Sequence, residues 1–157
     1  KKLTGIILAT VLTTGCAIDP YTGEEKVSNT AWGTGIGLGE ALQLAPGTPV
    51  TELHRVRLLD RAPVSLEVTW LPEALGCIVA RADLVTRDVF LVLEQDAGVA
   101  LGHATLAIDA ALADHATAAA LDTGAGAPVL RVERLTHDAH GTPIDFERLT
   151  FRGDAFQ

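Results

Sequence analysis

Two arginines, Arg55 and Arg57, are separated by one residue in a segment that the pattern predicts to be a β-strand. Because side chains alternate between the faces of a strand, both guanidinium groups project from one face. Glu67, in the next predicted strand, can lie on that face as well. Paired guanidinium groups suit a phosphate or carboxylate, which arginine binds bidentately. An exposed cross-strand ion pair, contributing under about 1 kcal/mol, explains the three residues equally well.

A second group of side chains follows the same rule near the C-terminus. Asp145, Glu147 and Phe151 alternate along one predicted strand and therefore share a face. Asp145 and Phe151 could contact the polar and apolar parts of a small ligand, and a plain sheet surface explains them equally well. The sequence thus offers two strand faces, either of which could bind a small molecule.

Other residue patterns give no support for catalysis. His137 and His140 flank a predicted turn, but their spacing matches no metal-binding pattern, so we expect them to be solvent-exposed. No motif with a nucleophile and its base occurs in the sequence. We therefore expect a protein that is not an enzyme, with no cofactor and no bound metal.

The distribution of charge divides the chain of 157 residues into two pieces. All lysines lie before residue 40, and in that segment the cationic and acidic residues balance. After residue 39 the cationic residues are arginines, apart from histidine, and this segment carries the whole net charge of −8. Such an acidic body disfavours non-specific attraction to nucleic acid or anionic lipid. We predict a leader over residues 1–39 and a folded domain over residues 40–157.

The leader has the features of an export signal. Two lysines precede about ten apolar-rich residues, too few to span a bilayer, and small residues then lead to Cys16. This arrangement resembles a bacterial lipoprotein signal, in which Cys16 becomes lipidated and anchors the protein to a membrane. The glycine-rich stretch that follows is similar to the N-terminus of outer-membrane lipoproteins of the OmpA-associated, glycine-zipper kind. A buried N-terminal helix is the alternative.

The later piece alternates predicted strands with short helices. Apolar residues recur with a period of two in the strands, whereas the helices end at glycines. Predicted strands cover Val50–Leu59, Val64–Leu71, Val99–Ala111, Pro128–His137 and Pro143–Arg152, and predicted helices cover a short segment after Pro72, Val85–Ala97 and Ala113–Leu121.

One hairpin is echoed by another. The residues Arg57-Leu58 followed by the segment 63–67 recur as Arg134-Leu135 followed by the segment 143–147, each segment beginning with proline and ending with glutamate. Two similar hairpins with helices between them predict an α+β domain built on an antiparallel sheet.

The order of these motifs is similar to that of the UTRA domain, the effector-binding part of GntR-type transcriptional regulators of the HutC subfamily. The resemblance covers about residues 40–157. The matching motifs are PGTPV at 46–50, RVRL at 55–58, PVSLE at 63–67, WLP at 70–72, AGAPVLRVER at 125–134, PIDFE at 143–147 and FRGD at 151–154.

The resemblance implies a chorismate-lyase-like α+β fold and the binding of a small effector. It assigns phosphate binding to Arg55 and Arg57 and places Glu67 beside them. It also places Asp88 and Phe90 where other members carry serine and tyrosine. On the last strand it puts Asp145 in the place of an acid that belongs to the binding site, and Phe151 in the place of a tyrosine. These replacements add a charge and remove hydroxyl groups, so the expected ligand is a small anionic metabolite of unspecified kind. A chorismate lyase is a further alternative, which rests on fold analogy alone.

The two resemblances imply different partners and locations. The UTRA resemblance implies a homodimer in the cytoplasm that contacts DNA only through a separate winged helix-turn-helix domain, which the sequence lacks. The N-terminal signal instead implies a lipoprotein of the cell envelope, anchored through Cys16, with a structural or ligand-binding body. Whether the two pieces form a natural fusion is left open by the sequence.

Overall fold

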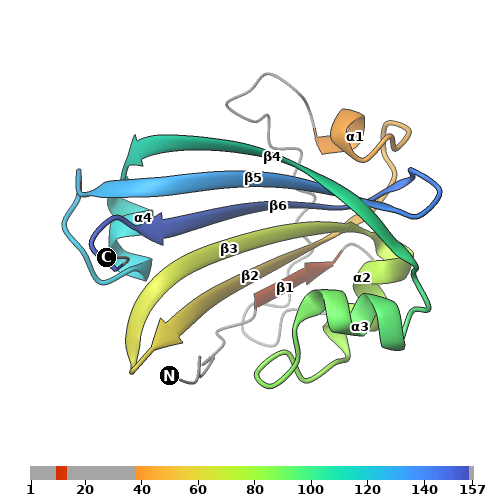
Figure 1. Cartoon of the computed structure of the whole chain (residues 1–157), viewed down its shortest axis with the longest axis horizontal. Coiled ribbons are helices and arrows are strands. Elements are labelled where there is room, and N and C mark those ends of the chain that lie inside the picture. Colours follow the sequence, from red (N-terminus) through yellow and green to blue (C-terminus); the bar gives the residue numbers. More distant parts are fainter. Residues whose placement is uncertain (1–9, 14–37, 156–157) are drawn as a thin grey trace.

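The computed structural model describes residues 10–13 and 38–155 and shows a curved antiparallel sheet with short helices on both of its faces (Figure 1). The strands follow the order β1-β2-β3-β6-β5-β4, and every neighbouring pair is antiparallel. The strands are β1 (Thr10–Thr13), β2 (Val50–Leu59), β3 (Ala62–Pro72), β4 (Leu101–Leu112), β5 (Pro128–Asp138) and β6 (Pro143–Arg152). The helices are α1 (Leu38–Ala41), α2 (Glu73–Ala80), α3 (Val89–Gln95) and α4 (His115–Ala120). This confirms the predicted α+β class.

Two long hairpins form the centre of the sheet. β2 and β3 form one, β5 and β6 form the other, and pairing of β3 with β6 joins them side by side. Asp60 and Arg61 connect β2 to β3 with φ values of 51° and 70°, as a tight two-residue hairpin turn requires. The predicted echo therefore corresponds to two equivalent hairpins that meet in one sheet.

The helices cover the sheet at different places. We call the face that carries Arg55 and Glu67 the arginine face. There α2 and α3 pack on Leu53 and Leu71, in a core cluster that also contains Val92. On the opposite face, α1 lies in a cluster with Trp70 and Phe146, and α4 packs with Val129. The helices thus leave room on the arginine face for a polar network beside α3.

Helix α3 is shorter than predicted. The sequence predicts a helix over Val85–Ala97, but α3 begins after Asp88, whose carboxylate accepts a hydrogen bond from the backbone N–H of Phe90 at 2.9 Å. Before it, Asp83 accepts a bond from the N–H of Val85 and holds a turn instead. Gly98, with a φ of 67°, follows the helix as predicted. The correction places Asp88 at the start of the helix rather than inside it.

Within the leader the structure describes Thr10–Thr13, which forms the short strand β1 against β2, and residues 38 and 39 at the start of α1. The predicted lipidation site, Cys16, and the glycine-rich stretch lie outside the described residues. Helix α1 spans the predicted boundary between residues 39 and 40, and that division of the chain stays a prediction.

Candidate effector site

The predicted pair Arg55 and Arg57 meets Glu67 on the arginine face. Arg55 lies directly opposite Glu67 in the β2–β3 ladder, and its Nη2 is 2.7 Å from Glu67 Oε2. Nε of Arg57 is 2.5 Å from Glu67 Oε1, so one carboxylate holds both guanidinium groups. Arg55 is 5% exposed and Glu67 2%, so the interpretation as an exposed ion pair is wrong for these two residues. The side chain of Arg57 is 32% exposed and is the member of this cluster that reaches solvent.

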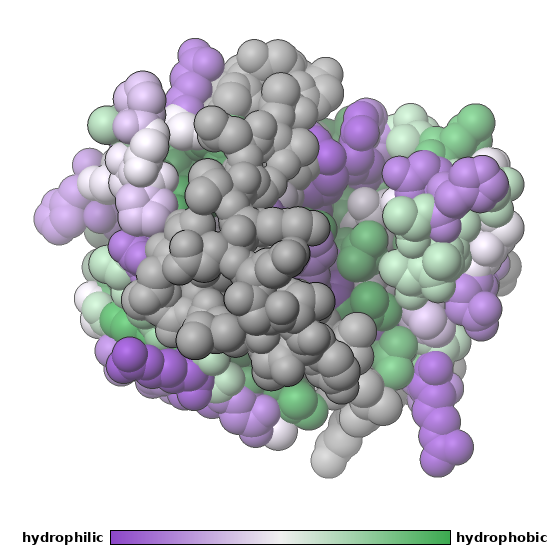
Figure 2. Space-filling view, turned by 180° about the vertical axis from the view of Figure 1, so that it is seen from behind, coloured by the Kyte–Doolittle hydropathy of each residue, from purple (hydrophilic) through white to green (hydrophobic). Residues whose placement is uncertain are grey.

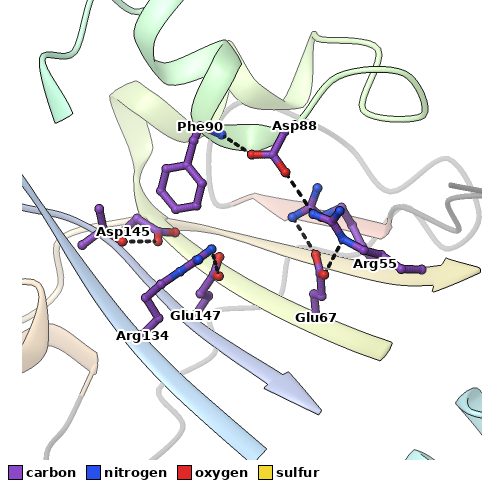
Figure 3. A network of polar contacts seen from close by, with 9 residues as sticks. Arg55, Glu67, Asp88, Phe90, Arg134, Asp145 and Glu147 are labelled. Atoms are coloured by element: carbon purple, nitrogen blue, oxygen red, sulfur yellow. Dashed lines mark hydrogen bonds and ion pairs between the residues drawn. The ribbon is translucent and has the colours of Figure 1, made fainter. Parts of the chain in front are cut away.

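Asp88 joins the cluster from α3. Its Oδ2 is 3.0 Å from Nη2 of Arg57, while its Oδ1 caps the helix through the N–H of Phe90 (Figure 3). Although partial burial opposes ionisation, the Phe90 N–H and Arg57 lower the pKa of Asp88. Burial works against the charge of Arg57 as well, yet Glu67 and Asp88 together raise the pKa of its guanidinium. Asp88 therefore stays ionised and links the start of α3 to the sheet.

The β5–β6 hairpin supplies an equivalent ion pair. Arg134 contacts Oε1 of Glu147, its direct neighbour across the β5–β6 ladder. The guanidinium carbon of Arg134 also lies 4.6 Å from the centre of the Phe90 ring, in a cation–π contact. The Arg134 side chain is 30% exposed, whereas Glu147 is 1% exposed. Figure 3 shows Phe90 reaching down from α3 toward this pair.

Asp145 lies deepest in the network. It is 0% exposed, and the hydroxyl of Thr136 donates to its Oδ2 at 3.2 Å. Burial, together with the neighbouring charge of Glu147, raises the pKa of Asp145 well above its usual value, which the nearby Arg134 and Arg55 only partly offset. Burial also raises the pKa of Glu147. This end of the network therefore favours a protonated carboxyl group.

Six of the seven residues predicted to bind an effector contribute to one polar network: Arg55, Arg57, Glu67, Asp88, Phe90 and Asp145. Phe151 lies on the same face, in the same cross-strand row as Arg57, separated from it by Ser65 of β3. Arg57 is the network residue of that row, and the other members of the network lie further along the sheet toward Asp145. The role of all seven in binding stays a prediction.

The predicted binding set omits Arg134 and Glu147, although the signal that identifies them is present in the sequence. Arg134 and Glu147 are the counterparts of Arg57 and Glu67 in the echoed hairpin. Both couples form ion pairs in the structure. A repeated hairpin that conserves its ion pair therefore gives two adjacent pairs once β3 and β6 come together.

The histidines give no metal centre in the described part of the chain. His137 stacks on His103 with ring centres 4.5 Å apart, and the N–H of His140 donates to Asp138 in the turn. Within residues 10–13 and 38–155, no three histidine, cysteine or acidic side chains are arranged so that they could hold a metal ion. None of the helices found there is long and apolar enough to cross a membrane.

Comparison with known proteins agrees with this architecture. The family model described as the UTRA domain matches residues 37–157. The chain belongs to the UTRA family. It is therefore homologous to the effector-binding domains of GntR-family transcriptional regulators, and the predicted chorismate-lyase-like fold agrees with their structures.

Individual relatives give the same assignment. The chain is 30% identical over 118 residues to the HTH-type transcriptional repressor PhnF of Mycolicibacterium smegmatis, an alignment that covers 74% of this chain and 48% of the relative. The chain thus spans about half the length of that curated relative. A GntR-family regulator from Enterococcus faecalis superposes with a TM-score of 0.68 at 28% identity, over 76% of this chain and 85% of that one. The crystal structure of PhnF from Mycobacterium smegmatis gives 0.74 at 25% identity, over 97% and 59%.

Proposed function

We propose that this UTRA domain binds a small anionic metabolite at Arg57 and transmits the binding through α3. The observation that carries the proposal is the position of Arg57, whose partly exposed guanidinium lies between a buried carboxylate and a partly exposed one. Glu67 is 2% exposed and fixed by Arg55, whereas the side chain of Asp88 is 39% exposed. An incoming anion therefore displaces Asp88 more readily than Glu67.

Displacement of Asp88 gives the site a route to the rest of the molecule. Asp88 holds Arg57 and caps α3 at the same time. An anion that takes its place on Arg57 removes a link between α3 and β2. The helix then has a different connection to the sheet in the bound and free states, which is the differential contact that an effector needs to shift a conformational equilibrium.

The test is a calorimetric titration of the protein with a panel of sugar phosphates and organic acids. Any compound that binds is then measured with Arg57→Ala and with Arg131→Ala. Arg131 is a matched control, because it is also a partly exposed, ion-paired arginine of the sheet but pairs with Asp109 on the opposite face. We expect Arg57→Ala to weaken binding at least about tenfold, which corresponds to one lost charged hydrogen bond. Unchanged affinity in Arg57→Ala, or an equal loss in Arg131→Ala, would refute the site.

The proposal also covers assembly. β4 is the last strand of the sheet within the described residues. On the arginine face it carries Leu106 and Ile108, which are 54% and 64% exposed. Its one charged residue, Asp109, is already paired with Arg131. An unprotected edge of this kind pairs readily with another strand, and two copies of β4 related by a two-fold axis satisfy each other. We therefore propose a homodimer contact at β4, and Ile108→Lys should shift the sedimentation coefficient to that of a monomer.

We extend the proposal to the protein's place in the cell. We propose that the UTRA domain acts in the cytoplasm as a sensor without catalysis, and that contact with DNA belongs to a separate domain. The lipoprotein resemblance of the leader, with anchoring through Cys16, stays a separate prediction, as does the division at residues 39 and 40. Membrane fractionation, with and without an inhibitor of lipoprotein signal cleavage, tests the lipidation of Cys16. An unprocessed cytosolic protein would exclude it.

A further inference from the structure

Three buried carboxylate oxygens at the deep end of the network have no hydrogen-bond partner in the described part of the chain: Oδ1 of Asp145 and both oxygens of Glu147. Oε1 of Glu147 forms the ion pair with Arg134, so Oδ1 of Asp145 and Oε2 of Glu147 are the two without either kind of contact there. The two residues are 0% and 1% exposed. A buried oxygen without a partner loses its hydration without compensation, so these two atoms mark a place for a hydrogen-bond donor.

The charges of the network favour a cationic donor there. The groups that face one another are three guanidinium groups, from Arg55, Arg57 and Arg134, and four carboxyl groups, from Glu67, Asp88, Asp145 and Glu147. The carboxyl groups exceed the guanidinium groups by one, so a single proton makes the free network neutral. Asp145 is the group that favours this proton, because it is fully buried beside the charge of Glu147, and both effects raise its pKa. The hydroxyl of Thr136 donates to its other oxygen, Oδ2. A cation beside Asp145 can take the place of that proton without leaving a net charge.

The dimensions suit one small molecule that spans both ends. Glu147 lies directly opposite Thr69, so Glu67 is its diagonal neighbour on the adjacent strand. Such neighbours have Cα atoms about 7–8 Å apart. The ring of Phe90 already receives the guanidinium of Arg134 and provides an aromatic face near the acidic end. Asp145 lies two residues beyond Glu147 on β6, which adds about 7 Å along the strand. A molecule that joins an anion on Arg57 to a cation between Asp145 and Glu147 therefore needs a chain of several atoms.

We propose, as a refinement that rests on the function proposed above, that the effector is a zwitterion. Its anionic group binds Arg57, and its ammonium group binds Oδ1 of Asp145 and Oε2 of Glu147. The proton held by Asp145 leaves to solvent as the ammonium group enters, so binding exchanges one positive charge for another. The ligand class is thus narrowed from a small anion to a small molecule with both charges.

The experiment compares three homologous series of probes with chains of two to six carbons: ω-aminoalkyl phosphates, ω-hydroxyalkyl phosphates and plain alkyl phosphates. Calorimetry at pH 7.5 in two buffers of different ionisation enthalpy gives both the affinity and the number of protons released. We expect one aminoalkyl phosphate to bind about tenfold or more tightly than its hydroxyl and alkyl counterparts. Its binding should release up to one proton more than that of the alkyl phosphate, and its affinity relative to the alkyl phosphate should rise with pH because that proton must leave.

Two variants locate the effect. Asp145→Asn and Glu147→Gln keep the shape of each side chain but remove its ability to ionise. Each should bring the aminoalkyl and alkyl phosphates to within about twofold of each other and abolish the proton release that distinguishes the aminoalkyl series. If a variant fails to fold, the proton count and the preference among probes in the natural sequence still decide the matter.

The outcomes separate this inference from the proposed function. If alkyl phosphates bind through Arg57 but the aminoalkyl series gains nothing, the zwitterion is refuted and the anion site stands. The zwitterion is also refuted, and the anion site stands, if hydroxyalkyl phosphates bind as tightly as aminoalkyl phosphates and no proton is released. In that case a neutral hydrogen-bond donor suffices beside the carboxyl groups. If no series binds in the millimolar range, or if Arg57→Ala leaves all affinities unchanged, both proposals are overturned.

Discussion

Replacement of Glu67 by glutamine is expected to destabilise the domain strongly even without a ligand. One buried carboxylate compensates two guanidinium groups, with contacts of 2.7 Å to Arg55 and 2.5 Å to Arg57. The neutral amide of glutamine leaves Arg55, which is 5% exposed, without its counter-charge. Breaking a buried ion pair by removal of one partner destabilises a protein by about 3–5 kcal/mol.

The lower end of that range applies here. Arg57 reaches solvent and keeps Asp88 as a second partner, so most of the loss comes from Arg55. A loss of about 3 kcal/mol in the free energy of unfolding corresponds to a fall in melting temperature of roughly 6–12 °C for a chain of this size. Urea denaturation followed by far-ultraviolet circular dichroism measures the free energy, and a thermal scan measures the melting temperature.

The control is Asp109→Asn, in the pair that Asp109 forms with Arg131. Both side chains are at least one-third exposed, so the loss should remain within about 1 kcal/mol. The double variant Glu67→Gln with Arg55→Met should recover part of the stability, because the uncompensated charge is then absent. If Glu67→Gln costs no more than Asp109→Asn, the buried pair contributes no more to stability than an exposed one.

Three further outcomes are expected. Gly76→Ala should cost about 1–3 kcal/mol in urea denaturation, because the added Cβ would lie 2.0 Å from the side-chain oxygen of Thr51; a change under about 0.5 kcal/mol would contradict this. Asp114→Ala should cost about 1 kcal/mol, since Asp114 caps α4 through the N–H of Thr117 at 2.7 Å, and Asp114→Asn should cost less. Because the pKa of Asp145 is raised in the folded state, the native protein holds a proton that the unfolded chain releases, and its stability falls as pH rises above the usual value for aspartate. Asp145→Asn should remove that fall, so unfolding curves of the two proteins between pH 5 and pH 8 should diverge as the pH increases, and parallel pH profiles would refute the raised pKa.

Apolar alternation in the sequence predicts the five long strands, β2 to β6, and the orientation of their side chains, whereas the short strand β1 falls in a segment predicted to be an export signal. The period of two in β2 and β3 places Arg55 and Arg57 on one face, and the echo of the first hairpin marks Arg134 as the counterpart of Arg57. These features are local, because alternation along a strand and pairing across a short turn need no information from distant residues. The extent of α3 was predicted less well, because Asp83 and Asp88 hold the preceding segment in turns that apolar periodicity does not reveal.

The contacts of the charged residues and the depth of their burial depend instead on how the strands and helices pack together. Pairing of β3 with β6 brings the two hairpins together and sets Glu147 near Glu67. Packing of α3 on the sheet then brings Asp88 to Arg57 and Phe90 to Arg134. Both contacts join residues more than thirty positions apart, so their geometry depends on the packing of the whole sheet rather than on local preference. Burial is the cause, since it turns an arrangement that would be a weak surface ion pair into a buried network in which the pKa of Asp145 is raised.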